Sequence, residues 1–114
     1  MTTATQMLGS DLDEFPAGFI AVEEEGGVAV LRLRGEIDQV AVAAYDRAHG
    51  AGTAPAVIDT SAVTFLDCRG LRFLVRQGAA ARRAGCAPAL RRPPRVVRRV
   101  LDVTGAQDLF TITG

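Results

Sequence analysis

The sequence predicts an α/β domain in which helices pack on a mixed, mostly parallel sheet of four to five strands. Segments with strand character alternate with segments of helical periodicity in the order β-β-α-β-α-β-α-β, which is typical of sheets built from crossover units. The 114 residues are 48% hydrophobic and 23% charged, enough to bury the core of one domain. We expect a flexible N-terminal tail over 1–14 and one domain over 15–114.

The first two strands are predicted at 15–22 and 28–34 and form a hairpin. The turn between them carries three glutamates, which we expect in solvent, and two glycines. In the second strand, Leu31 and Leu33 share one face with Ala29, so a period of two places that face on the core. Gly35 is expected to break this strand.

A helix is predicted over 39–49, because apolar residues recur there at helical spacing before Gly50. Its predicted inner face consists of Ala41, Ala44, Tyr45 and Ala48. A short buried strand over 56–58 follows and ends at Asp59. The polar residues after Asp59 predict a loop.

The helix predicted over 69–84 has two distinct sides. The inner side consists of Leu71, Leu74, Val75 and Gly78, and the outer side of Arg69, Arg72, Arg76 and Arg83. Phe73 is expected near the outer arginines. Beyond it we predict a strand over 86–90, a helix opened by Pro93-Pro94 and closed by Gly105, and a last strand over 109–112.

The composition excludes several functions. All 13 basic residues are arginines, so a lysine Schiff base and a P-loop lysine are absent. Residues 1–68 hold 3 arginines against 11 acids, whereas 69–114 hold 10 arginines against 2 acids. A basic half could bind nucleic acid, but aromatic residues make up only 5% and no zinc-finger or RNA-binding pattern accompanies it, so we expect no nucleic-acid partner.

No cofactor or metal site is predicted. Cys68 and Cys86 fit neither a disulfide-rich scaffold nor a paired zinc-ligand spacing, and His49 has no catalytic partner in sight. We therefore expect no catalytic residues and no enzyme. No signal peptide or membrane-spanning segment is predicted, which favours the cytoplasm and excludes membrane insertion.

Residues 57–71 (VIDTSAVTFLDCRGL) are the most informative part of the chain. A strand leads to the apolar pair Phe65 and Leu66, and Asp67 follows at a helix N-cap position. This stretch resembles the STAS domain of bacterial anti-sigma-factor antagonists, whose signature continues with Ser, Ser or Thr, Gly and Leu. The turn 35–38 (GEID), the Pro93-Pro94 helix start and the closing segment 104–110 resemble further landmarks of that family.

The resemblance implies a binding protein that acts in a partner switch. In the family, the dephosphorylated antagonist binds an anti-sigma factor that is also a Ser/Thr protein kinase, and so frees the sigma factor. Phosphorylation of the Ser after the motif Asp ends that binding. A phosphate adds about −1.5 to −2 charge at pH 7, which is enough to change the affinity of a surface at a helix N-terminus.

The chain departs from the family pattern at that Ser, because Cys68 stands in its place and is no substrate for a Ser/Thr kinase. Three interpretations are open. Cys68 fills a small, partly buried site in a domain that keeps binding but has lost the switch. Alternatively, it is a redox-sensing thiol beside Arg69, where oxidation adds polarity as phosphate would. Lastly, the switch has moved to one of the nearby hydroxyls, on Thr60, Ser61 and Thr64.

The predicted partner-binding residues follow from the resemblance and from the arginine pattern. They are Asp38, Asp67, Cys68, Arg69, Arg72 and Phe73, of which Asp67 equally predicts a helix cap and Asp38 a simple turn carboxylate. An exposed Phe73 between arginines would be typical of an interface hot spot. The alternative function is a STAS scaffold subunit of a sensory or transporter assembly, with other STAS proteins as partners.

Overall fold

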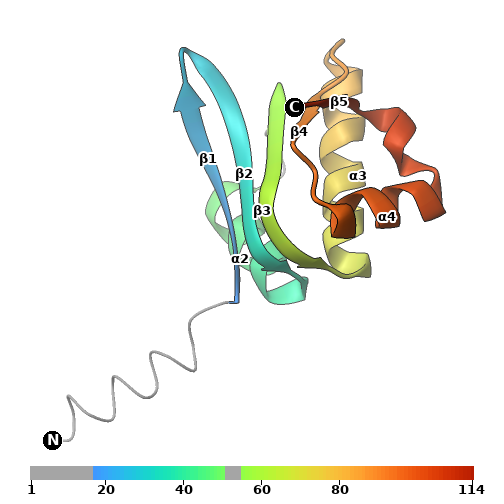
Figure 1. The fold of residues 1–114 in the computed structure, drawn as a ribbon. Helices are drawn as coiled ribbons and strands as arrows, with labels where there is room; N and C mark the ends of the chain where they lie inside the picture. The colour runs from blue at the N-terminus through green and yellow to red at the C-terminus, as the bar shows by residue number, and fades with distance from the viewer. Residues whose placement is uncertain (1–16, 51–54) are drawn as a thin grey trace, which may run out of the picture.

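The computed structural model describes residues 17–50 and 55–114, which form a five-stranded sheet with helices packed on it (Figure 1). In chain order the elements are β1 (Gly18–Glu25), β2 (Val28–Ile37), α2 (Gln39–His49), β3 (Val57–Leu66), α3 (Cys68–Arg83), β4 (Ala89–Arg91), α4 (Arg95–Thr104), the 3-10 helix η1 (Ala106–Leu109) and β5 (Thr111–Thr113). The predicted tail over 1–14 lies outside the described residues.

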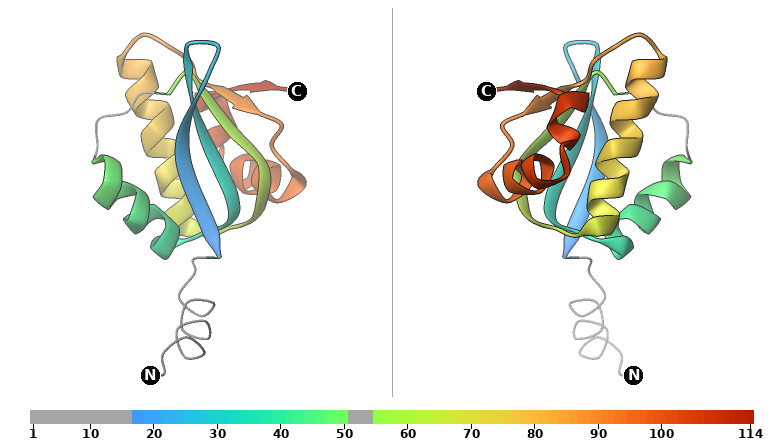
Figure 2. Two further views of the ribbon diagram at one scale, coloured as in Figure 1. Left: turned by 90° about the vertical axis from the view of Figure 1, so that its left-hand side faces the viewer. Right: turned by 90° about the vertical axis from the view of Figure 1, so that its right-hand side faces the viewer.

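The sheet has the order β1-β2-β3-β4-β5, with β1 antiparallel to β2 and all other neighbours parallel. This confirms the predicted mixed, mostly parallel sheet. Figure 2 shows α2 and α3 together on one side of the strands, whereas α4 lies apart from them and packs next to β3. We call the sheet face that is turned away from α2 and α3 the open face.

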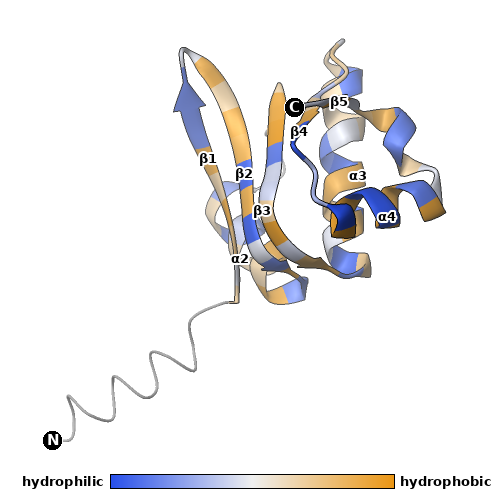
Figure 3. Cartoon of the chain, viewed as in Figure 1, coloured by the Kyte–Doolittle hydropathy of each residue, from blue (hydrophilic) through white to orange (hydrophobic). Residues whose placement is uncertain are grey.

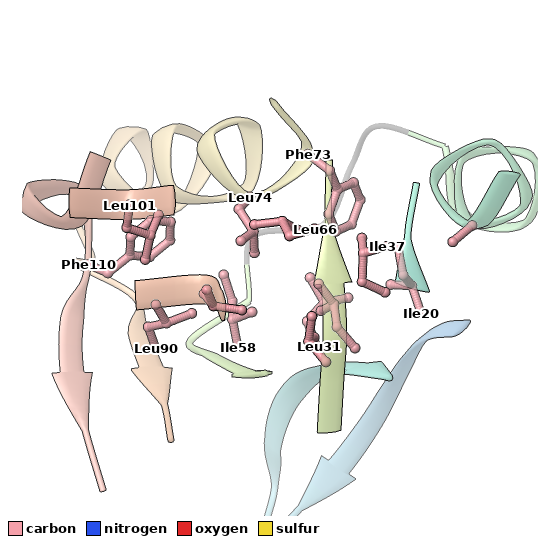
Figure 4. Packing of buried hydrophobic residues seen from close by; sticks show 14 of the residues in the cluster. Ile20, Leu31, Ile37, Ile58, Leu66, Phe73, Leu74, Leu90, Leu101 and Phe110 are labelled. Atoms are coloured by element: carbon pink, nitrogen blue, oxygen red, sulfur yellow. The ribbon is translucent and has the colours of Figure 1, made fainter. Parts of the chain in front are cut away.

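The hydrophobic core lies between the sheet and its helices (Figure 4). Leu31, Ile58 and Leu90 point into it from three neighbouring strands, while Leu74 and Leu101 reach it from α3 and α4. In β2, Arg32 lies between the buried Leu31 and Leu33 and faces the open side of the sheet. The predicted period of two in this strand is therefore confirmed.

Two helices have the predicted limits because their signals are local. α2 spans Gln39–His49, as predicted, and Gly50 follows it. α4 begins after Pro94, which needs no backbone N–H at that position, and ends at Gly105 in the left-handed conformation with φ of 75°.

Two strands are longer than predicted. β2 continues through Gly35, which adopts φ of 73° at an irregularity in the pairing with β3, so the expected break is wrong. A Cβ on Gly35 would lie 2.2 Å from the carbonyl oxygen of Ala17, which explains the glycine. β3 runs on to Leu66, and the loop predicted after Asp59 is wrong, because parallel pairing with β2 supplies hydrogen bonds that the polar residues do not signal.

The other strand limits move by a few residues. β1 extends to Glu25, so the three glutamates belong to a strand rather than to a solvated turn. β4 begins at Ala89 rather than at 86, and Leu109 belongs to η1, which delays β5 to Thr111.

Candidate functional site

The candidate site lies at the edge of the sheet where α2 and α3 begin. Asp38 directly follows β2 and Asp67 directly follows β3, and parallel strands bring these two ends together. The Asp67 Oδ1 atom accepts a hydrogen bond from the backbone N–H of Gly70 at 2.9 Å, which confirms the predicted cap of α3. The Asp38 Oδ1 atom accepts from the N–H of Ala41 at 3.1 Å and caps α2 in the same way.

The cap on α2 was not predicted, although its signal was present. Asp38 stands immediately before the helix predicted over 39–49, which is the N-cap position. The site therefore contains two neighbouring helix N-termini, each with a capping carboxylate.

Gly70 allows α3 to begin close to the end of β2. A Cβ at this position would lie 2.3 Å from the carbonyl oxygen of Ile37 and 2.6 Å from the Leu66 Cδ1 atom. The backbone N–H of Asp67 also donates to the Ile37 carbonyl, at 3.4 Å. The glycine of the motif thus has a packing reason, since it holds the first turn of α3 against β2.

Cys68 is the first residue of α3 and is exposed. The interpretation of Cys68 as a filler of a partly buried site is therefore wrong. The inner side of this part of α3 is occupied by Gly70, Phe73 and Leu74, which leaves the first residue of the helix in solvent.

The three nearby hydroxyls lie in β3 rather than in a loop, and they differ in access. Thr60 is fully buried. The Ser61 hydroxyl donates to the Asp59 Oδ1 atom at 2.7 Å. Ser61 and Thr64 are both exposed, but among the hydrogen bonds of the described residues only the Ser61 hydroxyl is engaged.

Phe73 is 1% exposed, so its predicted place on an open surface is wrong. α3 packs on two sides, against the sheet and against α2, which enlarges its buried face beyond the predicted one (Figure 4). The Phe73 ring meets Tyr45 of α2 edge to face, with 5.2 Å between centroids, and the Arg76 guanidinium lies 5.2 Å from its centroid. Phe73 is therefore a core residue beneath the arginines rather than a free contact residue.

A surface groove of about 400 Å³ lies along the contact between α2 and α3. It is lined by Gln39, Val42, Ala43, Asp46, Arg69, Arg72, Phe73 and Arg76. Arg76 forms a salt bridge with Asp46, with 2.7 Å between nitrogen and oxygen. Within 17–50 and 55–114, Arg69 and Arg72 have no salt bridge, so this groove offers positive charge beside Cys68.

The open face of the sheet carries a charged network that sequence reasoning missed. Asp59, 1% exposed, accepts from Arg91 at 2.8 Å, from Arg92 at 3.2 Å and from Arg32 at 3.5 Å. Glu25 accepts from Arg91 at 3.0 and 3.1 Å and also from Arg32. These partners are 7 to 66 residues apart in the chain, so no local sequence pattern predicts the pairs.

The network shifts the pKa values of its members. Burial is the largest influence on Asp59 and opposes ionisation, but the hydrogen bonds from Ser61, Arg91 and Arg92 together outweigh it and lower the pKa of Asp59 well below its ordinary value. The hydrogen bond from Arg91 lowers the pKa of Glu25, and the bonds to Glu25 and Asp59 raise the pKa of Arg91. All three groups therefore stay charged at neutral pH.

Neither a metal-ion cluster nor a membrane-spanning helix occurs in the described part of the chain. No three His, Cys, Asp or Glu side chains there come close enough together to hold a metal ion. None of its helices is long and apolar enough to cross a membrane.

Comparison with known proteins identifies the family. The family model described as "Mlab, STAS domain" matches residues 20–112. A solved anti-sigma factor antagonist from Mycobacterium paratuberculosis is 32% identical, with a TM-score of 0.66 over 84% of this chain and 85% of that one. The anti-sigma factor antagonist SpoIIAA in its unphosphorylated form is 22% identical, with a TM-score of 0.64 over 83% of this chain and 88% of that one, and shares the fold.

No match was found among curated proteins. Because the family model matches most of its sequence, the chain belongs to the STAS domain family.

Proposed function

We propose that this chain is an anti-sigma factor antagonist that binds an anti-sigma factor with a Ser/Thr kinase-like fold and so frees a sigma factor. The observation that carries the proposal is the similarity over 84% of the chain to the mycobacterial antagonist, at 32% identity. The proposed role is binding without catalysis or a cofactor, and both partners would act in the cytoplasm.

The proposed contact surface is the edge where α2 and α3 begin. Asp38 and Asp67 each cap a helix through Oδ1, and among the hydrogen bonds of the described residues neither Oδ2 atom is used. These oxygens can accept hydrogen bonds from a partner. Cys68 is exposed between them and the arginines, and Arg69 and Arg72 suit acidic side chains of the partner.

The proposed antagonist works without the usual Ser phosphorylation. Cys68 takes no phosphate from a Ser/Thr kinase, so the partner-binding state would persist in the presence of kinase and ATP. Two routes to regulation remain: oxidation of the exposed Cys68, and phosphorylation of Thr64.

The test is partner capture with four baits: wild type, Cys68→Asp, Cys68→Ser and Cys86→Asp. Cys86 is also exposed but lies in the loop before β4, so Cys86→Asp is a matched control for adding a carboxylate. Bound proteins from the native cytosol are identified by mass spectrometry. Each bait is then incubated with the captured kinase and radiolabelled ATP.

We expect wild type and Cys86→Asp to hold a kinase-like anti-sigma factor and Cys68→Asp to lose it, because the new carboxylate mimics phosphate. Only Cys68→Ser should be labelled by the kinase. Labelling of wild type that Thr64→Ala abolishes would move the switch to Thr64. Recovery of other STAS proteins alone, with no kinase, would refute the antagonist and support the scaffold alternative.

A further inference from the structure

β1 is an edge strand whose first five residues lack the usual protection of edges. One side of β1 pairs with β2 over its whole length, and no strand of the described residues pairs with the other side (Figure 1). Its first five residues, 18–22 (GFIAV), carry no charge, and the acidic residues begin only at Glu23 (Figure 3). Natural edge strands are commonly blunted by charges, prolines or bulges, because free backbone groups attract another strand.

α2 extends this edge into an apolar surface. Ala41 and Tyr45 are buried, but Ala44 and Ala48 of the predicted inner face are exposed. With residues 18–22 of β1 they line a groove of about 290 Å³ between the strand and the helix. On the other side of the strand, Phe19 is 54% exposed. The free strand edge is thus flanked by apolar groups on both faces of the sheet.

We propose that this surface is the contact between two copies of the chain, in which β1 pairs antiparallel with β1 of the second copy and joins the two sheets. A two-fold axis at Ile20 places Gly18 opposite Val22 and Phe19 opposite Ala21, so uncharged residues meet throughout. The acidic residues of each copy then lie beyond the paired segment, at opposite ends, and do not repel one another. This self-complementarity favours a second copy over another occupant.

Pairing of the two β1 strands also determines where the two α2 helices lie. Antiparallel strands bring the two α2 helices side by side in opposite directions, with the side that carries Ala44 and Ala48 turned to the second copy. Small side chains allow helices to approach closely. The α2–α3 groove involves Gln39, Ala43 and Asp46 on another side of the helix, so each copy could still bind a partner.

Sedimentation velocity over a wide range of protein concentration tests the proposal. We expect wild type to pass from monomer to dimer as its concentration rises. A variant with Ala44→Glu and Ala48→Glu should have a dissociation constant at least about tenfold higher, because like charges would meet across the axis. Ala84→Glu, at an exposed alanine after α3, is the matched control and should leave the dimer unchanged.

Variants of opposite charge provide the most direct test of the proposed contact. A second variant with Ala44→Lys and Ala48→Lys should be monomeric alone but form a one-to-one dimer with the glutamate variant. Circular dichroism verifies that each variant is folded. Monomeric wild type at every concentration, a dimer insensitive to the glutamates, or no mixed dimer would each overturn the proposal.

Discussion

Replacement of Asp59 by Asn tests whether the charged network on the open face stabilises the fold. The Asp59 carboxylate is buried and accepts hydrogen bonds from the Ser61 backbone N–H at 2.9 Å, the Ser61 hydroxyl at 2.7 Å and three arginines. Asparagine keeps the shape but removes the charge and puts an NH₂ donor in place of one oxygen. That donor would face either guanidinium groups or the Ser61 N–H, so bonds are lost in either orientation.

The expected loss follows from the bonds and from their exposure. Removing one partner of a buried, charged pair costs about 3–5 kcal/mol. The arginine side chains here are 21% to 55% exposed, so water replaces part of what each one loses. We therefore expect Asp59→Asn to lower the free energy of unfolding by about 2–4 kcal/mol, a large share of a stability of about 5–15 kcal/mol.

The lowered pKa of Asp59 also predicts how this loss of stability changes with pH. Because the pKa of Asp59 is lower in the folded than in the unfolded protein, its contribution is present above the unfolded pKa of about 3.9 and is lost as pH falls below that value. In that window the unfolded state binds the proton first, and Asp59 alone lowers stability by about 1.4 kcal/mol per pH unit. The difference between wild type and Asp59→Asn should therefore shrink as the pH falls from 5 towards 2, given the pKa values above.

Urea denaturation followed by circular dichroism over that pH range measures both quantities. Asp102→Asn is the matched control, because Asp102 is exposed on α4 and has no salt bridge among the described residues. A loss below about 0.5 kcal/mol at neutral pH, the level of ordinary surface substitutions, would refute the reasoning. So would a difference from wild type that does not change with pH.

Three further substitutions address the site and the core. Gly70→Ala should lower the free energy of unfolding by about 1–3 kcal/mol although alanine favours helices, because the new Cβ would press on the Ile37 carbonyl; urea denaturation checks this. Asp67→Ala should cost about 1 kcal/mol through the lost cap, and faster hydrogen exchange confined to the first turn of α3 would locate the loss. Phe73→Ala should cost about 3–5 kcal/mol in thermal or urea unfolding, as expected of a core residue, whereas a loss below about 0.5 kcal/mol would restore the exposed position first predicted.

The sequence predicted best those elements whose limits depend on neighbouring residues. α4 has a proline before it and a glycine after it, and α2 has Asp38 before it and Gly50 after it. β3 was predicted too short, because its polar half is held by pairing with β2, whose residues lie some 30 positions earlier. Strand propensity is weak information where a partner strand supplies the hydrogen bonds.

The residues of the candidate site were likewise predicted well where the signal is local and poorly where it is not. Asp67 and Cys68 were placed correctly at the start of a helix, because the cap and the motif are local. The error at Phe73 came from counting one buried face on α3, whereas α2 covers a second one, and Tyr45 and Arg76 enclose the ring. Contacts between two helices depend on how they are placed over the sheet, which periodicity within one helix does not specify.

On the open face, the strand order predicts neighbours that periodicity within one element does not. Leu31, Ile58 and Leu90 point into the core from three adjacent strands, so the residues that follow them in β2, β3 and β4 face the other side of the sheet. Those residues are Arg32, Asp59 and Arg91, one charge on each of three adjacent strands. The alternation therefore predicts that a carboxylate lies between two arginines once the strand order is known. The strand order does not predict the bonds from Ser61 and Arg92, which complete the surroundings of this buried carboxylate.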